Sequence, residues 1–242
     1  QTIYYPLAWA SAASWVEIEG GTHVPWSPCF HYLDWHWRPF LQRMGYRLPL
    51  KLEKAGYYPR GGGRLQAVID PVDRKKPLLI EDRGSVEQIR GLSAVSNLSE
   101  HIARRQRKRT VARLGAQFPL NDIRLRNIPA AGKGSLMLLL IEFSRSQACF
   151  FSLGERGKRA ETVADEAVEQ VLDCLHTRGA IDVFLADQLL LPLCLTGKRS
   201  RIILPDVSGH LRTNARVIET FLEIEIHFHK QEGGDWMMEV EG

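Results

Sequence analysis

The sequence has 242 residues, of which 44% are hydrophobic and 25% charged, and its formal net charge is +4. These values are typical of a globular protein with one large or two smaller domains, and they exclude a histone-like polycation or an acidic tail protein. No apolar run approaches the roughly 18 residues of a membrane helix, so we expect no membrane partner. Four scattered cysteines without a Cys-x-x-Cys pair indicate reduced thiols and a cytoplasmic location, with a nuclear one open for a eukaryotic source.

The N-terminal 80 residues predict a strand, a helix and two more strands. The expected elements are a strand over 15–19, a loop over 20–28, a helix over 28–44 and strands over 46–54 and 64–71. Ser27 is expected to cap the helix, with Pro28 at its first position. The last two strands are joined by 56–63, which ends in three glycines. A flexible hairpin is favoured there over a phosphate loop, although the flanking Arg60 and Arg64 could still meet a phosphate.

The C-terminal segment predicts the same order of elements. We expect a strand over 202–205, a loop over 206–209, a helix over 211–222 and strands over 223–229 and 236–240. The two segments share this order of elements, but their amino-acid residues do not match. We interpret the order as an internal duplication.

The middle of the chain differs from both ends in its charge composition and in its order of elements. Residues 81–176 carry 15 Lys and Arg against 12 Asp and Glu, which is most of the net positive charge. The expected elements there are a strand over 85–97, a helix over 99–114, strands over 134–143 and 148–153, and a helix over 160–176. We therefore predict an inserted α/β domain over 81–176, and a main domain made of 1–80 and 177–242. An apolar helix over 183–195 returns to the main core, and Pro192 should kink or end it.

A basic helix lies in this inserted segment. Its cations are Arg104, Arg105, Arg107, Lys108, Arg109 and Arg113. Either they form a solvated face, or the first four contact the phosphate backbone of a nucleic acid without reading its sequence. Arg124 and Arg126, on a nearby strand, could extend such a patch.

His210 stands at a loop-to-helix junction. Free N–H groups and the helix dipole gather anions at such a place, and a neutral histidine can attack a phosphorus atom. The alternative is an ordinary histidine near a helix cap. Upstream, Phe184 and Asp187 share one helix face, where they could bind a base and a ribose, or could be a core residue and an exposed carboxylate.

Five segments together resemble the RNA 3′-terminal phosphate cyclases. They are GGTHVPWSP (20–28), GYYPRGGG (56–63), RGSVEQIRG (83–91), ADQLLLP (186–192) and SGHLRTN (208–214). The resemblance implies an α/β (α+β) fold of repeated units, each with helices packed on a four-stranded sheet. A smaller inserted α/β domain is expected to interrupt these units.

The resemblance also implies an enzyme, a ligase-type nucleotidyl transferase. ATP and Mg²⁺ or Mn²⁺ would bind, and His210 would become a histidyl-AMP. The adenylate would pass to an RNA 3′-phosphate, and the adjacent 2′-OH would close a 2′,3′-cyclic phosphodiester. Two alternatives are a non-catalytic relative that assembles ribosomes, against which His210 argues, and an RNA-binding α/β scaffold.

Matched positions imply further roles. Phe184 and Pro28 resemble the two faces that sandwich the adenine, Asp187 and Gln188 match nucleotide-site positions, and Gln1 matches a polar residue near the phosphates. The family's glycine-rich GEGGGQ-type segment, with its acidic metal ligand, does not occur in these 242 residues. We therefore expect no metal ligand within this chain, a missing repeat unit upstream, and no self-adenylation by the chain alone.

Overall fold

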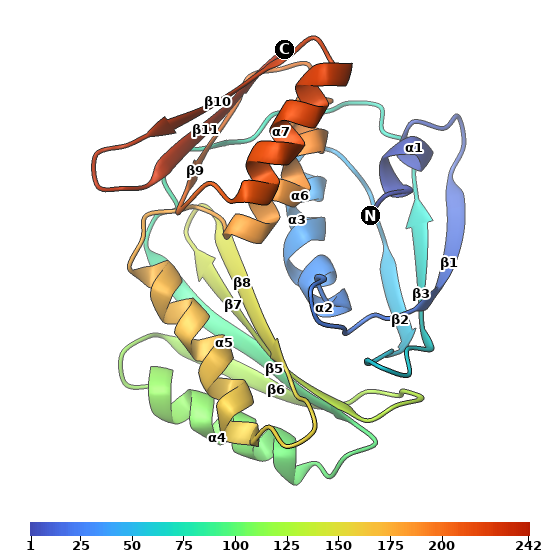
Figure 1. Ribbon diagram of the computed structural model, residues 1–242, viewed down its shortest axis with the longest axis vertical. Coiled ribbons are helices and arrows are strands. Elements are labelled where there is room, and N and C mark those ends of the chain that lie inside the picture. Colours follow the sequence, from blue (N-terminus) through green and yellow to red (C-terminus); the bar gives the residue numbers. More distant parts are fainter.

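The computed structural model describes residues 1–242 and contains three β-sheets with helices between and beside them, an α+β fold as expected (Figure 1). The helical segments are α1 (Tyr4–Ala8), α2 (Phe30–Tyr32), the π-helical η1 (Leu33–Trp37), α3 (Arg38–Arg43), α4 (His101–Leu114), α5 (Ala160–Leu175), α6 (Val183–Cys194) and α7 (Gly209–Phe221). The strands are β1 (Ser14–Gly20), β2 (Leu50–Lys54), β3 (Gly63–Ile69), β4 (Leu79–Ile80), β5 (Val86–Ser96), β6 (Leu120–Asn127), β7 (Gly134–Phe143), β8 (Gln147–Leu153), β9 (Ser200–Leu204), β10 (Glu225–Lys230) and β11 (Trp236–Glu241). No helix is both long and apolar enough to cross a membrane.

The first sheet has the strand order β1-β3-β2, with β3 antiparallel to both neighbours. It has three strands where four were expected. The strand predicted over 46–54 begins only at Leu50, because Tyr46 and Leu48 are buried in the main core and Pro49 has no N–H for a sheet.

The second sheet has the order β10-β11-β9-β4. In both sheets the second strand of the hairpin lies between the strand before the helix and the first strand of the hairpin. This shared strand order agrees with the predicted duplication. The short strand β4, which the sequence did not reveal, adds a fourth strand parallel to β9.

Helices α1, α3, α6 and α7 pack with these two sheets around one core of 31 buried residues. The helix predicted from Pro28 begins two residues later, at Phe30. Cys29 is its N-cap residue, and no side chain caps the helix. Ser27 Oγ instead contacts the carbonyl oxygen of Pro28, so the predicted Ser27 cap was wrong.

Pro192 lies inside α6, which ends two residues later at Cys194. Because proline has no N–H, the carbonyl of Gln188 loses its helical partner. The hydroxyl of Tyr5, from α1, donates to that carbonyl at 3.4 Å. The carbonyl that Pro192 leaves without a helical partner therefore connects α6 to α1.

The third sheet, of order β6-β5-β7-β8, comes entirely from residues 86–153. Helices α4 and α5 cover one of its faces (Figure 1). The other face packs on α2 and on the β2–β3 loop of the first sheet, where the Tyr57 ring lies against the backbone of Gly134. Since β7 is covered on both faces, it is a continuous apolar run rather than an alternating one. The division into two domains stays a prediction.

Candidate functional site

His210 lies in the first turn of α7, and its side chain is exposed. Ser208 is the N-cap residue, and its Oγ accepts a hydrogen bond from the Leu211 N–H at 3.1 Å. The N–H groups of Gly209 and His210 have no partner within the helix, because they belong to its first turn. The structure thus presents an imidazole beside free amide groups, which suits contact with an anion.

Asn214 stands one turn after His210 on the same face of α7. Its amide donates to Asp187 of α6, to the backbone oxygen at 3.2 Å and to Oδ1 at 3.1 Å. This contact brings the predicted Asp187 next to the helix that carries His210. Asn214 was not predicted, although its position four residues after His210 was a signal for it.

Gln188, the next residue of α6, extends the cluster. Its Oε1 accepts from the Gln1 amide at 2.6 Å, and its own amide donates to the Phe184 carbonyl at 3.0 Å. The Phe184 ring is 61% exposed, so it is free to stack on a ligand. Four predicted residues, which lie up to 187 positions apart in the chain, therefore gather around α6 near the start of α7.

Pro28 lies in the β1–α2 loop and shares no hydrogen bond with this cluster. An indirect contact connects them, because Tyr32 of α2 donates to Asp182 Oδ1 at 2.8 Å. Asp182 is the N-cap residue of α6 and accepts from the N–H groups of Phe184 and Leu185. The helix after Pro28 is thus fixed to the helix that carries Phe184.

Asp182 is the centre of a buried network that the sequence did not reveal. His36 Nε2 lies 2.6 Å from Asp182 Oδ2, and both side chains are at most 1% exposed. Burial alone would raise the pKa of Asp182, but the charge and hydrogen bond of His36, with the Tyr32 hydroxyl, hold it below its usual value. The only local signal was an Asp just before an apolar helix, a common N-cap pattern.

A second unpredicted cluster joins two histidines near Pro28. His23 Nε2 lies 2.9 Å from His31 Nδ1, and Thr22 Oγ1 lies 2.8 Å from His23 Nδ1. Burial, and then the neighbouring His31, lower the pKa of His23 to about 3, and burial lowers the pKa of His31 to about 4. Both rings are therefore neutral near pH 7 and support the β1–α2 loop from within.

The basic helix α4 is largely paired with α5. Arg105 contacts Glu161 at 2.6 Å, Arg109 contacts Asp165 at 2.8 Å, and Arg113 contacts both Asp165 and Glu169. Arg104 pairs with Glu100 on its own helix at 2.9 Å. Of the four cations predicted to bind RNA, only Arg107 and Lys108 are exposed and without a carboxylate partner. The predicted RNA contact stays a prediction, with fewer free charges than the sequence suggested.

Arg124 and Arg126 cannot extend that patch. In the sheet register they pair with Leu92 and Ala94, which face the β2–β3 loop. Helix α4 lies on the opposite face, where Ile123 packs. The sequence showed that Arg124 and Arg126 share one face of a strand, but it did not show which face of the sheet that is.

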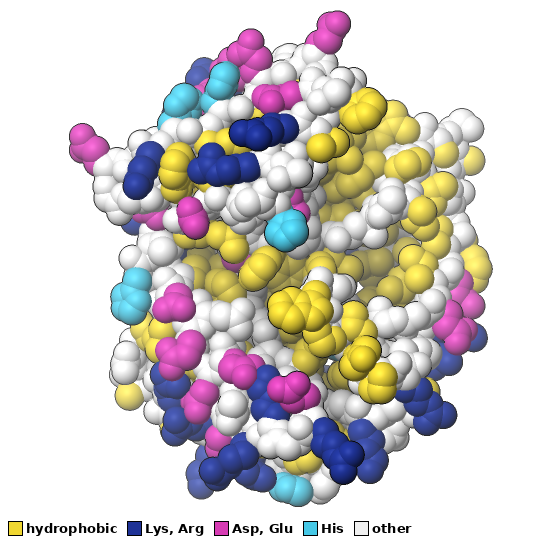
Figure 2. All heavy atoms as spheres, in the orientation of Figure 1, with side chains coloured by type: hydrophobic (Ala, Val, Ile, Leu, Met, Phe, Trp, Pro, Cys, Tyr) yellow, Lys and Arg dark blue, Asp and Glu magenta, His cyan; other side chains and the backbone are white.

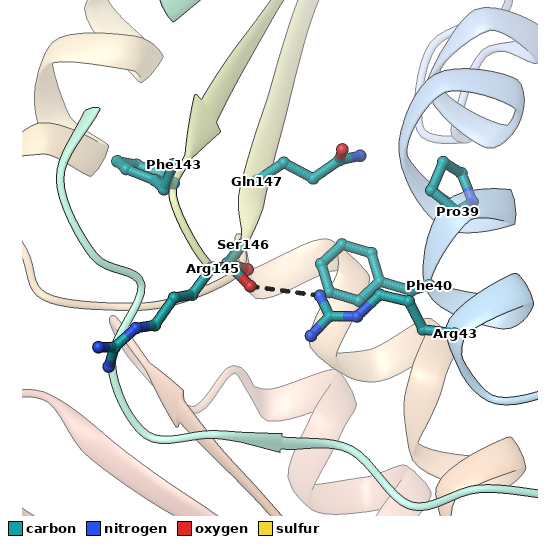
Figure 3. A pocket seen from close by; sticks show the side chains of 7 residues that line it. All are labelled: Pro39, Phe40, Arg43, Phe143, Arg145, Ser146 and Gln147. Atoms are coloured by element: carbon teal, nitrogen blue, oxygen red, sulfur yellow. Dashed lines mark hydrogen bonds between the residues drawn. The ribbon is translucent and has the colours of Figure 1, made fainter. Parts of the chain in front are cut away.

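No predicted site residue lines the cavity of about 200 Å³ between α3 and the β7–β8 turn (Figure 3). There Arg43 Nη1 approaches the Arg145 carbonyl oxygen at 3.5 Å. No cluster of three or more His, Cys, Asp or Glu side chains is arranged to hold a metal ion. His227 and His229 lie side by side on β10, and His227 contacts Glu225.

Comparison with known proteins places the chain in a family. The family model for RNA 3′-terminal phosphate cyclase matches residues 1–228. The chain is 37% identical to the RNA 3′-terminal phosphate cyclase of Ectopseudomonas mendocina and 38% identical to that of Pseudomonas fluorescens, and each alignment covers 93% of the present chain. It is 34% identical to the RNA 3′-terminal phosphate cyclase of Pyrobaculum aerophilum, in an alignment that covers 100% of the present chain. The chain spans 65% of the first two relatives and 70% of the third. All five segments that carry the resemblance lie within residues 1–228. The chain therefore belongs to the RNA 3′-terminal phosphate cyclase family.

Proposed function

We propose that the protein converts the 3′-terminal phosphate of an RNA to a 2′,3′-cyclic phosphodiester at the expense of ATP, with His210 as the adenylated nucleophile. The observation that supports this proposal is the gathering of Gln1, Phe184, Asp187 and Gln188 beside the helix whose first turn carries His210. Family membership supports the same reaction.

In the proposed first step an imidazole nitrogen of His210 attacks the α-phosphorus of ATP. An N–P bond forms, the bond from the α-phosphorus to the bridging oxygen breaks, and pyrophosphate leaves. The free N–H groups of Gly209 and His210 stabilise negative charge on the phosphate oxygens. Since His210 is exposed and no carboxylate contacts its ring, the α-phosphate can reach the ring nitrogens.

In the following steps an oxygen of the RNA 3′-phosphate attacks the same phosphorus, and His210 is released. The 2′-OH then attacks the 3′-phosphorus, loses its proton, and displaces AMP. Adenylation supplies the leaving group that a phosphate monoester lacks, and the vicinal hydroxyl is already held at high effective concentration.

The nucleoside would lie across α6. The exposed Phe184 ring offers one stacking face, and Pro28, on the loop fixed through Tyr32 and Asp182, offers the other. The Asp187 carboxylate, which Asn214 holds, would accept a hydrogen bond from the ribose. Mg²⁺ or Mn²⁺ would be held chiefly by the triphosphate, because Mg²⁺ usually needs only one or two protein carboxylates besides phosphates and waters.

Self-adenylation tests the proposal. The protein, as its gene encodes it, is incubated with ATP labelled at the α-phosphate, and acid-labile label on the protein is measured. We expect label in the wild type and in His229→Ala, a matched exposed histidine on β10, and none in His210→Ala. Label that persists in His210→Ala would overturn the assignment of the nucleophile.

The stacking role needs a separate variant. Phe184→Ala should raise the ATP concentration at half-maximal labelling about tenfold, because an aromatic stack on a base is lost. Phe221→Ala removes an even more exposed ring from the far end of α7 and should leave that concentration unchanged. Equal effects of the two variants would contradict the proposed adenine site.

The partners of this reaction would be ATP and an RNA with a 3′-phosphate end. We propose a cytoplasmic location, which the four free cysteines support, because reduced thiols are typical of that compartment.

A further inference from the structure

We propose that three neighbouring loops form a binding surface for the single-stranded RNA segment that precedes the reacting 3′ end. The exposed side chains of these loops are Trp26, Tyr58, Arg60 and Lys133, and Arg126 of the adjoining strand β6 extends this loop surface. The inference rests on the proposed function for the identity of the RNA. The surface itself is argued from the geometry of the loops.

The first two loops are held together by backbone hydrogen bonds. The N–H groups of Thr22 and His23 both donate to the Gly56 carbonyl at 3.0 Å, and the Gly56 N–H donates to Thr22 Oγ1 at 2.9 Å. The rings of His23 and Tyr57 also contact each other in a tilted arrangement, with centroids 5.2 Å apart and an interplanar angle of 32°. The loop that carries Trp26 is therefore fixed beside the loop that carries Tyr58.

The third loop, between β6 and β7, is fixed to the second. The Ala55 N–H donates to the Pro129 carbonyl at 2.7 Å, and the Arg60 guanidinium donates to the Ala131 carbonyl at 2.8 Å. The Asn97 amide holds the same loop through two further carbonyls. Arg60 and Lys133 thus project from loops that are in contact with each other.

Trp26 is the most unusual residue of this surface. Its side chain is 102% exposed, and its backbone φ of 64° lies in the left-handed region that a bulky residue rarely adopts. A ring in that position adds nothing to the core and strains the backbone, and such strain clusters at ligand sites. Tyr58, 74% exposed on the adjoining loop, supplies a second free ring.

The charge of the surface fits a polyanion. The loops 21–29, 55–62 and 128–133 contain no Asp or Glu. Neither Arg60, Lys133 nor Arg126 has a carboxylate partner, and Arg126 lies on the sheet face that the β2–β3 loop adjoins. Figure 2 shows hydrophobic and basic side chains next to one another where these loops lie in Figure 1.

Exposed rings interleaved with unpaired cations are what proteins use to bind single strands, since every base has a face to stack and every nucleotide a phosphate. Trp26 also lies two residues before Pro28, the proposed adenine contact. The loop surface therefore continues from the proposed site, as a strand that delivers its 3′ end to that site requires.

The test measures binding of a fluorescent single-stranded oligoribonucleotide with a 3′-phosphate, of about ten nucleotides, to the protein as its gene encodes it, without ATP. We expect Trp26→Ala to raise Kd about tenfold and Trp26→Tyr to restore most of the affinity. Trp15→Ala, which removes an exposed tryptophan from β1, is the matched control and should leave Kd unchanged. An equal Kd for Trp26→Ala and Trp15→Ala would overturn the proposal.

Two further measurements separate stacking from charge. The double variant Arg60→Gln with Lys133→Gln should lower the slope of log Kd against log salt by about 0.7 for each lost phosphate contact, whereas Lys230→Gln on β10 should not. The same RNA annealed to its complement should bind without dependence on Trp26, because paired bases cannot stack on it. An unchanged slope, or an equal Trp26 effect on the duplex, would contradict the loop surface. Failure of self-adenylation with Trp26-dependent binding intact would overturn the cyclase proposal alone.

Discussion

The two repeated units have the same strand order but use their strand-to-helix connection differently. In the second unit four residues separate β9 from α7, and Ser208 caps the helix, whose first turn carries His210. In the first unit nine residues separate β1 from α2, and no side chain caps the helix. That longer connection carries Trp26 and Pro28.

Under the proposed function, one topology thereby serves two chemical tasks. A short capped connection fixes a reactive group and leaves amide groups free beside it. A long connection instead carries side-chain rings, here those of Trp26 and Pro28, and contacts with other parts of the fold must hold it in place. Asp182, the N-cap residue of α6, and the pair of His23 and His31 provide that support in the first unit.

The largest expected effect comes from removing the Asp182 carboxylate. Asp182→Ala leaves His36, Tyr32 and two backbone N–H groups buried without an acceptor. We expect it to lower the free energy of unfolding by about 3 kcal/mol, in the range for breaking a buried pair. Urea denaturation measures this change. Asp187→Ala, which removes a half-buried carboxylate from the same helix, is the control. An equally small loss in both variants would show that α6 does not hold the first unit.

The second effect depends on pH. Since the pKa values of His23 and His31, about 3 and about 4, lie below the ordinary 6.5, the unfolded chain binds more protons than the folded one below pH 6.5. The stability contributed by the neutral pair is therefore present above pH 6.5 and is lost as pH falls towards 4. We expect the two histidines together to cost about 2.5 kcal/mol of unfolding free energy between pH 7 and pH 5.5, measured by urea denaturation.

His31→Gln removes one of these titrating groups and should flatten that pH dependence. His227→Gln, at an exposed position on β10, should leave it unchanged. If both variants keep the wild-type profile, the histidine pair does not support the long connection.

The third effect contrasts the two helix starts directly. Ser208→Ala removes the only side-chain cap of α7 and should cost about 1 kcal/mol of unfolding free energy. Ser27→Ala, at the position where the sequence predicts a cap, should cost nothing measurable, because the helix begins at Phe30. Equal losses would mean that the first helix begins earlier than described.

The smallest effect concerns α4, which exposed ion pairs hold to α5. Arg105→Gln breaks a pair with Glu161, and we expect no measurable change in stability, since exposed pairs contribute little. Arg107→Gln with Lys108→Gln should lower the salt slope of RNA binding by about 0.7 per contact, whereas Arg105→Gln should not. Identical slopes in all these variants would make α4 a solvated face.

Local patterns predicted most of the elements. The strand over 134–143 was predicted with the observed bounds, and the helices over 160–176 and 183–195 each end within one residue of α5 and α6. Short elements were missed: α1 has five residues and β4 has two, too few for a period to show.

Contacts between residues far apart in the sequence also could not be predicted. Tyr32 and Asp182 lie 150 residues apart, and nothing in either neighbourhood indicates that they meet. The site residues were predicted through the family resemblance, and the structure gathers most of them around α6. The partners that hold them, Asn214 and Asp182, follow from the fold and not from spacing along the chain.

Gly134 shows how much can depend on a missing side chain. A Cβ atom there would lie 2.3 Å from the ring carbons of Tyr57, well inside contact distance. The ring packs on that backbone, and the contact of Tyr57 with His23 connects it to the loop that bears Trp26. The packing of the third sheet on the β2–β3 loop therefore requires a glycine at position 134. Any larger residue there would displace Tyr57 and, through it, both the third sheet and the loop that bears Trp26.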